Sequence, residues 1–194
     1  KIVTAVASFI CDNAVQYDLT FITEYTREHI GFDSEEGDVD YTYAPESYYE
    51  FTTDDVESHN QLYSDILAAD NSNVTAMVFF VDHMDSDITI PEGVYPINSS
   101  TALGTVYASP GVAVGGGPIQ SYFCYTIEKE DGIYYDQEGL YCLVDGTVTV
   151  KKVNGKLSID VDAYNSYDLS VKLHYNPAQS AVEDITIGNT NISK

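Results

Sequence analysis

Three closely spaced carboxylates form the clearest candidate for a metal site in this sequence. Asp82, Asp85 and Asp87 fall within the segment DHMDSD, between two stretches of strand character. Carboxylate oxygens are the ligands that calcium prefers, and one loop can direct several of them at one ion. The segment lacks the glycine and the final glutamate of an EF-hand loop, so an ordinary solvated turn is the alternative. We expect no other cofactor.

A pair of acidic residues that hydrolyses a glycosidic bond is the catalytic alternative. That mechanism needs two carboxyl groups at a set separation with divergent pKa values. With 31 Asp and Glu the chain offers pairs everywhere, and the pattern selects none of them. No G-x-S-x-G or H-E-x-x-H motif occurs, and His174 falls on the polar face of its segment, where we expect it to be solvated. We therefore predict a non-catalytic binding or structural module, with no catalytic residue, and keep a secreted glycosidase-like hydrolase as the alternative.

A cluster of aromatic residues is the candidate ligand-binding site. Its members lie in one short, acidic segment: Tyr41, Tyr43, Tyr48, Tyr49 and Phe51. Tyr buries a large area and keeps a polar tip, which suits contact with a glycan or with another protein. Two other interpretations stay open: the rings hold the segment against a sheet, or Tyr41 and Tyr43 form one face of an ordinary strand.

The charge of the chain limits its partners. The formal net charge is −23, and no Lys or Arg occurs between Arg27 and Lys129. Such a surface repels phosphate backbones and anionic lipids, so we expect no nucleic-acid partner. No apolar run reaches the length that spans a bilayer, and we expect membrane attachment only through a lipid anchor upstream of Lys1. The acidic run from Asp33 to Asp40 is expected to repel itself and to stay mobile.

Alternating apolar residues predict a β-meander over residues 140–175. Leu140, Cys142, Val144, Val148 and Val150 would share one face of its first strand. Asn154-Gly155 suits a two-residue hairpin turn, which opposes Val150 with Ile159. A three-residue loop at 164–166 would then return the chain. Both turns bury the same faces, so we predict an antiparallel sheet with one wet face.

The rest of the chain extends this pattern to one all-β domain over residues 1–194. Residues 4–10 and 14–24 predict an opening hairpin. Residues 26–72 change in composition and are expected to form an acidic, Tyr-rich surface insertion, with one short helix at 54–69. The predicted fold is an antiparallel β-sandwich or squat barrel of eight to ten short strands.

Three cysteines, Cys11, Cys124 and Cys142, occur without a C-x-x-C spacing. By strand parity Cys142 lies with Val148 and Val150, whereas Cys124 lies on the opposite face of its own strand. We therefore expect buried thiols and no disulfide.

Several segments carry a resemblance to a known family. The residues concerned are Tyr17 and Leu19, then Ile90, Pro91, Gly93 and Tyr95, then Gly104 and Thr105, then Ser121 and Tyr122, and finally residues 145–150 in YCLVDGTVTVKKVNGKLSIDVDA. Their order resembles that of secreted, cell-surface β-sandwich lipoproteins of gut Bacteroidetes. The resemblance covers roughly half the chain and rests on turns and core positions. It implies an all-β protein at the cell surface or in the periplasm, it transfers no catalytic residue, and it leaves the glycan or protein ligand open.

Overall fold

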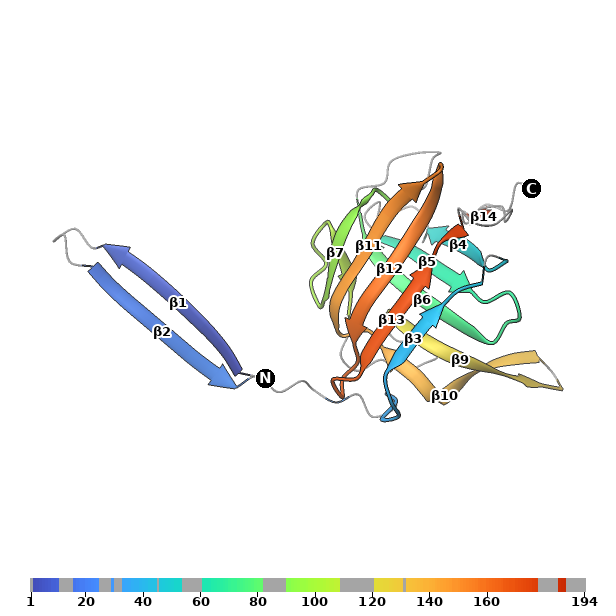
Figure 1. Ribbon diagram of the computed structural model, residues 1–194, viewed down its shortest axis with the longest axis horizontal. Coiled ribbons are helices and arrows are strands. Elements are labelled where there is room, and N and C mark those ends of the chain that lie inside the picture. Colours follow the sequence, from blue (N-terminus) through green and yellow to red (C-terminus); the bar gives the residue numbers. More distant parts are fainter. Residues whose placement is uncertain are drawn as a thin grey trace.

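The strands among the described residues form two separate β-sheets. The computed structural model describes residues 2–10, 16–24, 29, 33–44, 46–53, 61–81, 90–108, 121–130, 132–177 and 185–187. Within these residues β1 pairs only with β2, and the other twelve strands form one sheet. Figure 1 shows the β1–β2 hairpin standing apart from this large sheet, which curls strongly into a half-barrel.

The strands are as follows: β1 (Ile2–Ile10), β2 (Gln16–Glu24), β3 (Val39–Thr42), β4 (Tyr48–Thr53), β5 (Gln61–Leu67), β6 (Asn73–Phe80), β7 (Gly93–Asn98), β8 (Thr105–Tyr107), β9 (Tyr122–Lys129), β10 (Gly132–Cys142), β11 (Asp145–Val153), β12 (Lys156–Tyr164), β13 (Ser170–Tyr175) and β14 (Ile185–Ile187). The all-β prediction is confirmed. No helix among the described residues is long and apolar enough to cross a membrane.

The large sheet is mixed, which corrects the prediction of a purely antiparallel one. Its strands follow the order β14-β4-β5-β6-β8-β7-β11-β12-β13-β3, with β9 pairing with both β6 and β10. Three neighbouring pairs are parallel: β7 with β8, β13 with β3, and β14 with β4. The strand count also exceeds the predicted eight to ten, because the described part of the supposed insertion adds strands and the meander contains one more than expected.

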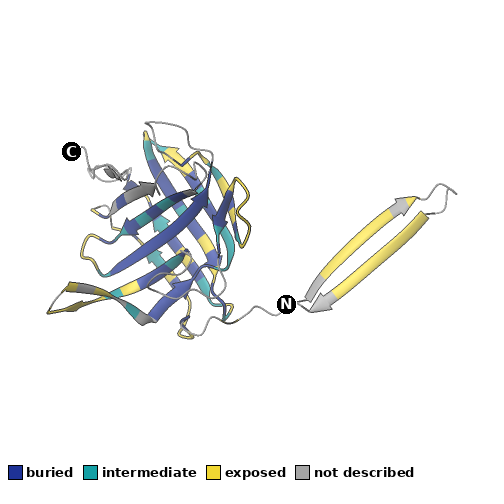
Figure 2. Ribbon diagram, turned by 180° about the vertical axis from the view of Figure 1, so that it is seen from behind, coloured by how far each residue is buried: buried dark blue, intermediate teal, exposed yellow. Residues whose placement is uncertain are grey.

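The core lies on the concave side of the curl. Tyr49, Phe79, Phe123, Ile159 and Leu173 are among its largest fully buried side chains. They come from β4, β6, β9, β12 and β13, so strands from the whole length of the sheet close around one apolar interior. Figure 2 shows this burial concentrated on the curled sheet, whereas the β1–β2 hairpin is exposed wherever its side chains are described.

The predicted turn at Asn154-Gly155 is confirmed. Both residues have positive φ, 52° and 84°, as a two-residue hairpin turn of this type requires. Val150 pairs with Ile159 and Val148 with Val161, as expected. The inner face of β11 and β12 is therefore the apolar one.

The prediction of one continuous first strand in the meander is wrong, because this part of the chain forms two strands. β10 ends at Cys142 and pairs with β9, whereas β11 starts at Asp145 and pairs with β7 and β12. Between them, Leu143 donates its N–H to Ser121 and Val144 donates to Tyr164, so the chain passes from one neighbour to another. The break reverses parity. Tyr141 and Leu143 join Val148 and Val150 in the main core, while Leu140 and Cys142 pack in a smaller cluster with Val74 and Cys124.

The second loop of the meander is longer than predicted. β12 ends at Tyr164 and β13 begins at Ser170, which leaves a loop at 165–169. The Oδ1 atom of Asn165 accepts the N–H groups of Tyr167 and Leu169, both at 3.0 Å, and Asp168 has a φ of 63°. Ala163 pairs with Val171, a register four residues away from the predicted one. Because four is even, the same faces are buried.

The predicted helix at 54–69 is wrong over residues 61–67, which form β5 between β4 and β6. Leu62, Ser64 and Ile66 point into the core and alternate with partly exposed residues, a period of two. The polar Ser64 occupies one of the inward positions, so the apolar residues of the sequence do not by themselves show this period of two. Residues 54–60 lie outside the described residues. The prediction of a surface insertion fails as well, since Val39, Tyr43, Tyr49, Leu62 and Ile66 belong to the core.

Candidate functional site

The predicted aromatic cluster contributes to the core wherever its side chains are described. Tyr43 and Tyr49 are buried, and Tyr41 packs partly buried against the same core. Tyr43 shares a hydrogen bond of 2.5 Å with the hydroxyl of Thr75, and burial raises the pKa of its phenol. Tyr41 meets Tyr43 edge-on, with 4.9 Å between ring centroids. These three rings therefore attach β3 and β4 to the interior, and the side chains of Tyr48 and Phe51 lie outside the described part.

The predicted calcium site, Asp82, Asp85 and Asp87, also lies outside the described residues. Within the described ranges no group of three or more His, Cys, Asp and Glu side chains is placed to hold a metal ion.

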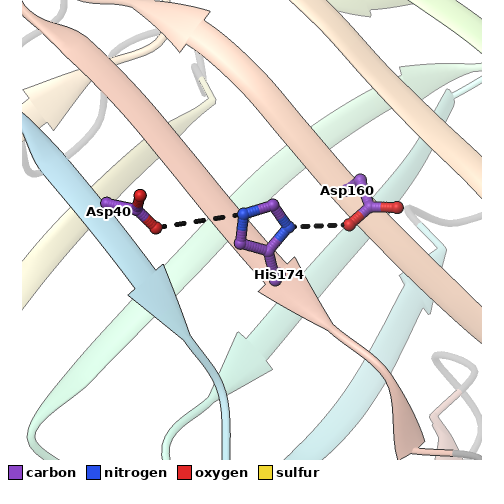
Figure 3. Close-up of polar contacts among 3 residues, drawn as sticks. All are labelled: Asp40, Asp160 and His174. Atoms are coloured by element: carbon purple, nitrogen blue, oxygen red, sulfur yellow. Dashed lines mark hydrogen bonds and ion pairs between the residues drawn. The ribbon is translucent and has the colours of Figure 1, made fainter.

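On the outer face of the curled sheet, His174 lies between the carboxylates of Asp40 and Asp160 (Figure 3). His174 on β13 has its Nδ1 atom 2.8 Å from Oδ1 of Asp160 on β12, and its Nε2 atom 3.9 Å from Oδ1 of Asp40 on β3. Because a carboxylate only accepts, Nδ1 donates in the shorter contact. The imidazole is 43% exposed, so water competes for both contacts. This arrangement links β3, β13 and β12 through their solvent-facing side chains.

The sequence placed His174 on a polar face but missed its partner. The strand register opposes Asp160 directly to His174, whereas the three-residue loop would have opposed Asp160 to Ser170. A predicted loop of five residues, as the structure has it, would have placed Asp160 opposite His174.

Asp33, which precedes β3, has a buried carboxylate that connects β10 with the loop between β12 and β13. Asp33 is 6% exposed, and its carboxylate accepts four hydrogen bonds. The donors are the N–H of Cys142 (2.9 Å), the Nδ2 atom of Asn165 (3.3 Å), and the N–H (2.7 Å) and hydroxyl (2.6 Å) of Ser166. Burial raises the pKa of Asp33, and these hydrogen bonds oppose the rise. Because one carboxylate accepts from Cys142 on β10 and from Ser166 in the 165–169 loop, Asp33 connects these two segments.

The acidic run that starts at Asp33 is anchored, which corrects the expectation that it stays mobile. Ser34 donates its N–H to the carbonyl of Leu140 at 2.7 Å, and Asp38 accepts the N–H of Ser170 at 2.8 Å. Hydrogen bonds to backbone groups compensate for the repulsion between neighbouring carboxylates that the sequence suggested.

Neither Cys124 nor Cys142 is in a disulfide, and both are buried, as predicted. The parity argument behind that prediction is wrong, because both thiols belong to the same small cluster. Burial raises the pKa of Cys124 to about 12, so its thiolate form is scarce near neutral pH. Cys124 therefore has the properties of a structural thiol. Cys11 lies outside the described part of the chain.

Among the described residues, the β1–β2 hairpin carries several exposed large apolar side chains. Its register opposes Ala5 to Phe21 and Ala7 to Leu19, which puts these four side chains and that of Tyr17 on one face. Leu19 is 55% exposed and Phe21 is 64% exposed. This set, Ala5, Ala7, Tyr17, Leu19 and Phe21, is called the hairpin face below. It contains no charged group.

The opposite side of the hairpin mixes polar groups with apolar ones, since Val6, Ile10 and Ile22 lie on it and are 72%, 71% and 65% exposed. Ser8 donates to Asp18 at 2.5 Å, and Gln16 donates to the same carboxylate at 3.0 Å. These hydrogen bonds, that from Ser8 most of all, lower the pKa of Asp18 and keep it ionised. The two sides therefore differ in charge: the opposite side contains an ionised carboxylate, and the set called the hairpin face contains none. Comparison of the chain with protein-family models, with curated proteins and with solved structures gives no match.

Proposed function

We propose that this protein is a non-catalytic binding or structural module that engages a protein partner through the hairpin face. The observation that carries the proposal is the exposure of Leu19 and Phe21 on a two-stranded sheet without a covering layer in the described structure. An isolated two-stranded hairpin is at best marginally stable in water, and it gains stability when its apolar face is covered. Large exposed apolar surfaces on soluble proteins commonly mark interaction sites.

The polar groups elsewhere support a structural role over a catalytic one. Asp33 accepts hydrogen bonds from four donors, Cys124 is buried with a raised pKa, and His174 contacts the carboxylates of Asp160 and Asp40. A partner that is a protein also suits an uncharged apolar face better than a glycan does, because a glycan needs hydrogen-bonding groups as well as rings.

The resemblance to gut Bacteroidetes lipoproteins leads us to propose a location at the cell surface or in the periplasm, and to propose that the curled sheet is the sandwich of that family. The high negative charge supports a secreted protein, since it favours solubility.

Binding of Nile red, an uncharged dye that fluoresces on apolar surfaces, tests whether the hairpin face is an accessible apolar surface. At submicromolar protein concentration we expect dye fluorescence that is reduced in Leu19→Glu with Phe21→Glu, and part of it remains because Val6, Ile10 and Ile22 on the opposite side are exposed as well. The matched control, Thr4→Glu with Thr20→Glu, adds the same charge to the opposite side and should reduce the signal less. Equal fluorescence in wild type and the Leu19/Phe21 variant would contradict the proposal.

A further inference from the structure

We propose that the hairpin face is covered by the same face of a second copy of this chain. This inference rests on the proposed function and names its partner. The two hairpins would pack face to face and form a small four-stranded sandwich that joins two curled sheets.

The first support is the shape of the middle of the face, where small side chains on one strand lie beside large side chains on the other. Ala5 and Ala7 on β1 pair with Phe21 and Leu19 on β2. In this middle stretch the large side chains form a ridge and the small ones a furrow along the strands. A twofold axis that runs along the strands in the interface places the ridge of each copy over the furrow of the other. Closed dimers need such a self-complementary surface.

The second support is charge. Each copy carries a formal net charge of −23, so association through any acidic surface is opposed by repulsion. The hairpin face avoids this cost locally, because none of its side chains is charged and Asp18 points to the other side. Repulsion between the two curled sheets remains, and salt screens it.

The third support is area. A ribbon of two nine-residue strands is about 30 Å long and about 10 Å wide. Packing two such ribbons face to face buries on the order of 1,000 Å² in total, which is near the lower limit of specific interfaces. The expected association is therefore weak and reversible.

Analytical ultracentrifugation of the full chain tests the proposal. Over about 1 to about 200 µM protein in high salt, we expect wild type to change from monomer to dimer, with weaker association in low salt. Leu19→Glu with Phe21→Glu should stay monomeric, and Thr4→Glu with Thr20→Glu should dimerise like wild type. Wild type that stays monomeric over the whole range would overturn the proposal, as would a Leu19/Phe21 variant that still dimerises.

A second variant covers the case in which new charges unfold the hairpin itself. Ala7→Leu keeps the face apolar and its strand character intact but fills the furrow. We expect at least about a tenfold weaker dimer, because the ridge of the other copy no longer fits. Unchanged or stronger dimerisation would overturn the ridge-and-furrow arrangement.

The two proposals fail in different ways. Monomeric wild type that binds Nile red through Leu19 and Phe21 removes the second copy as partner and leaves the binding surface. Monomeric wild type whose Nile red signal does not depend on these residues removes both.

Discussion

Two hairpins in this molecule have the same dimensions and opposite surroundings. β1–β2 and β11–β12 each consist of two nine-residue strands in an unbroken antiparallel register. On β12, Ile159 and Val161 are 0% and 1% exposed, whereas Leu19 on β2 is 55% exposed. Apolar alternation looks alike in both, so it predicts which residues share a face and not what covers that face.

The difference lies in the neighbours. β11–β12 continues into β7 on one side and β13 on the other, and its inner face closes over the core. β1–β2 pairs with no third strand among the described residues. Hydrophobic stabilisation comes from area removed from water, so the same residue types contribute much to one hairpin and little to the other.

The largest expected effect comes from a substitution in the buried hairpin, β11–β12. Ile159→Asp places a carboxylate in the core opposite Val150, without a partner to compensate its charge. Loss of the side chain and burial of the charge together exceed about 5 kcal/mol, the whole stability of many domains. We expect an unfolded chain by circular dichroism and by hydrogen exchange.

The matched control is Asp162→Ser on the same strand, where the side chain faces water. It should change the free energy of unfolding by less than about 0.5 kcal/mol. Ser158, which the alternation alone marks as solvent-facing, is a poorer control because it is 9% exposed. Similar losses at positions 159 and 162 would contradict the assignment of the two faces.

The second largest expected effect on stability comes from a substitution of Asp33, which precedes the first strand of the curled sheet. Asp33→Asn keeps the shape but directs an NH₂ group at donors that the carboxylate now accepts. We expect a loss of about 2 to 4 kcal/mol in the free energy of unfolding at neutral pH, measured by urea denaturation. Asp38→Asn, at an exposed residue with one backbone hydrogen bond, should cost less than half as much.

The same variant predicts a pH dependence. Because the folded state raises the pKa of Asp33 above its usual value of about 4, the folded protein binds more protons than the unfolded one in that interval. The contribution of Asp33 to stability therefore falls as pH rises from about 4 through the folded pKa. Asp33→Asn lacks this titration, so its deficit relative to wild type should be larger at pH 4 than at pH 7. A deficit that shrinks on acidification would mean that the hydrogen bonds outweigh burial.

These elements show how far the fold could be predicted. Asn154-Gly155 set a register that the structure confirms, because a two-residue turn leaves no freedom in strand pairing. The loop after β12 was mispredicted because Asn165 stabilises a five-residue connection through its side chain. β5 was mistaken for a helix because Ser64 occupies an inward position. Which residues share a face depends on parity, so that part of the prediction is correct despite the wrong loop length. Which residues pair across two strands depends on the loop length, so that part is wrong.

The polar network around Asp33 was beyond local reasoning. Its partners Cys142 and Ser166 lie 109 and 133 residues away in the chain. No spacing rule connects such positions, and an acidic run looks solvated when its partners are unknown. The His174 pair was closer to prediction, since only the loop length separated it from the correct register.

A third, smaller effect compares the solvent side of the buried hairpin with its inner side. A double-mutant cycle of His174→Ala and Asp160→Ala should give a coupling of about 0.5 kcal/mol, weakened by salt, because both side chains are nearly half exposed. The control cycle uses Asp162, which lies opposite Lys172, with His174, and should give almost no coupling. A coupling above about 2 kcal/mol would show that this outer ladder matters as much as core contacts.

The smallest expected effect returns to the exposed hairpin. Leu19→Asp makes on β2 the same kind of change that Ile159→Asp makes on β12, but its side chain starts in water, so little apolar burial is lost in the monomer. At submicromolar concentration we expect the unfolding of the curled sheet to change by less than about 0.5 kcal/mol. Tyrosine fluorescence during urea denaturation follows that sheet, because its core contains Tyr43, Tyr49, Tyr95 and Tyr175. A destabilisation approaching that of Ile159→Asp would mean that the hairpin face packs on the sheet of its own chain in solution, and the contrast between the two hairpins would then be lost.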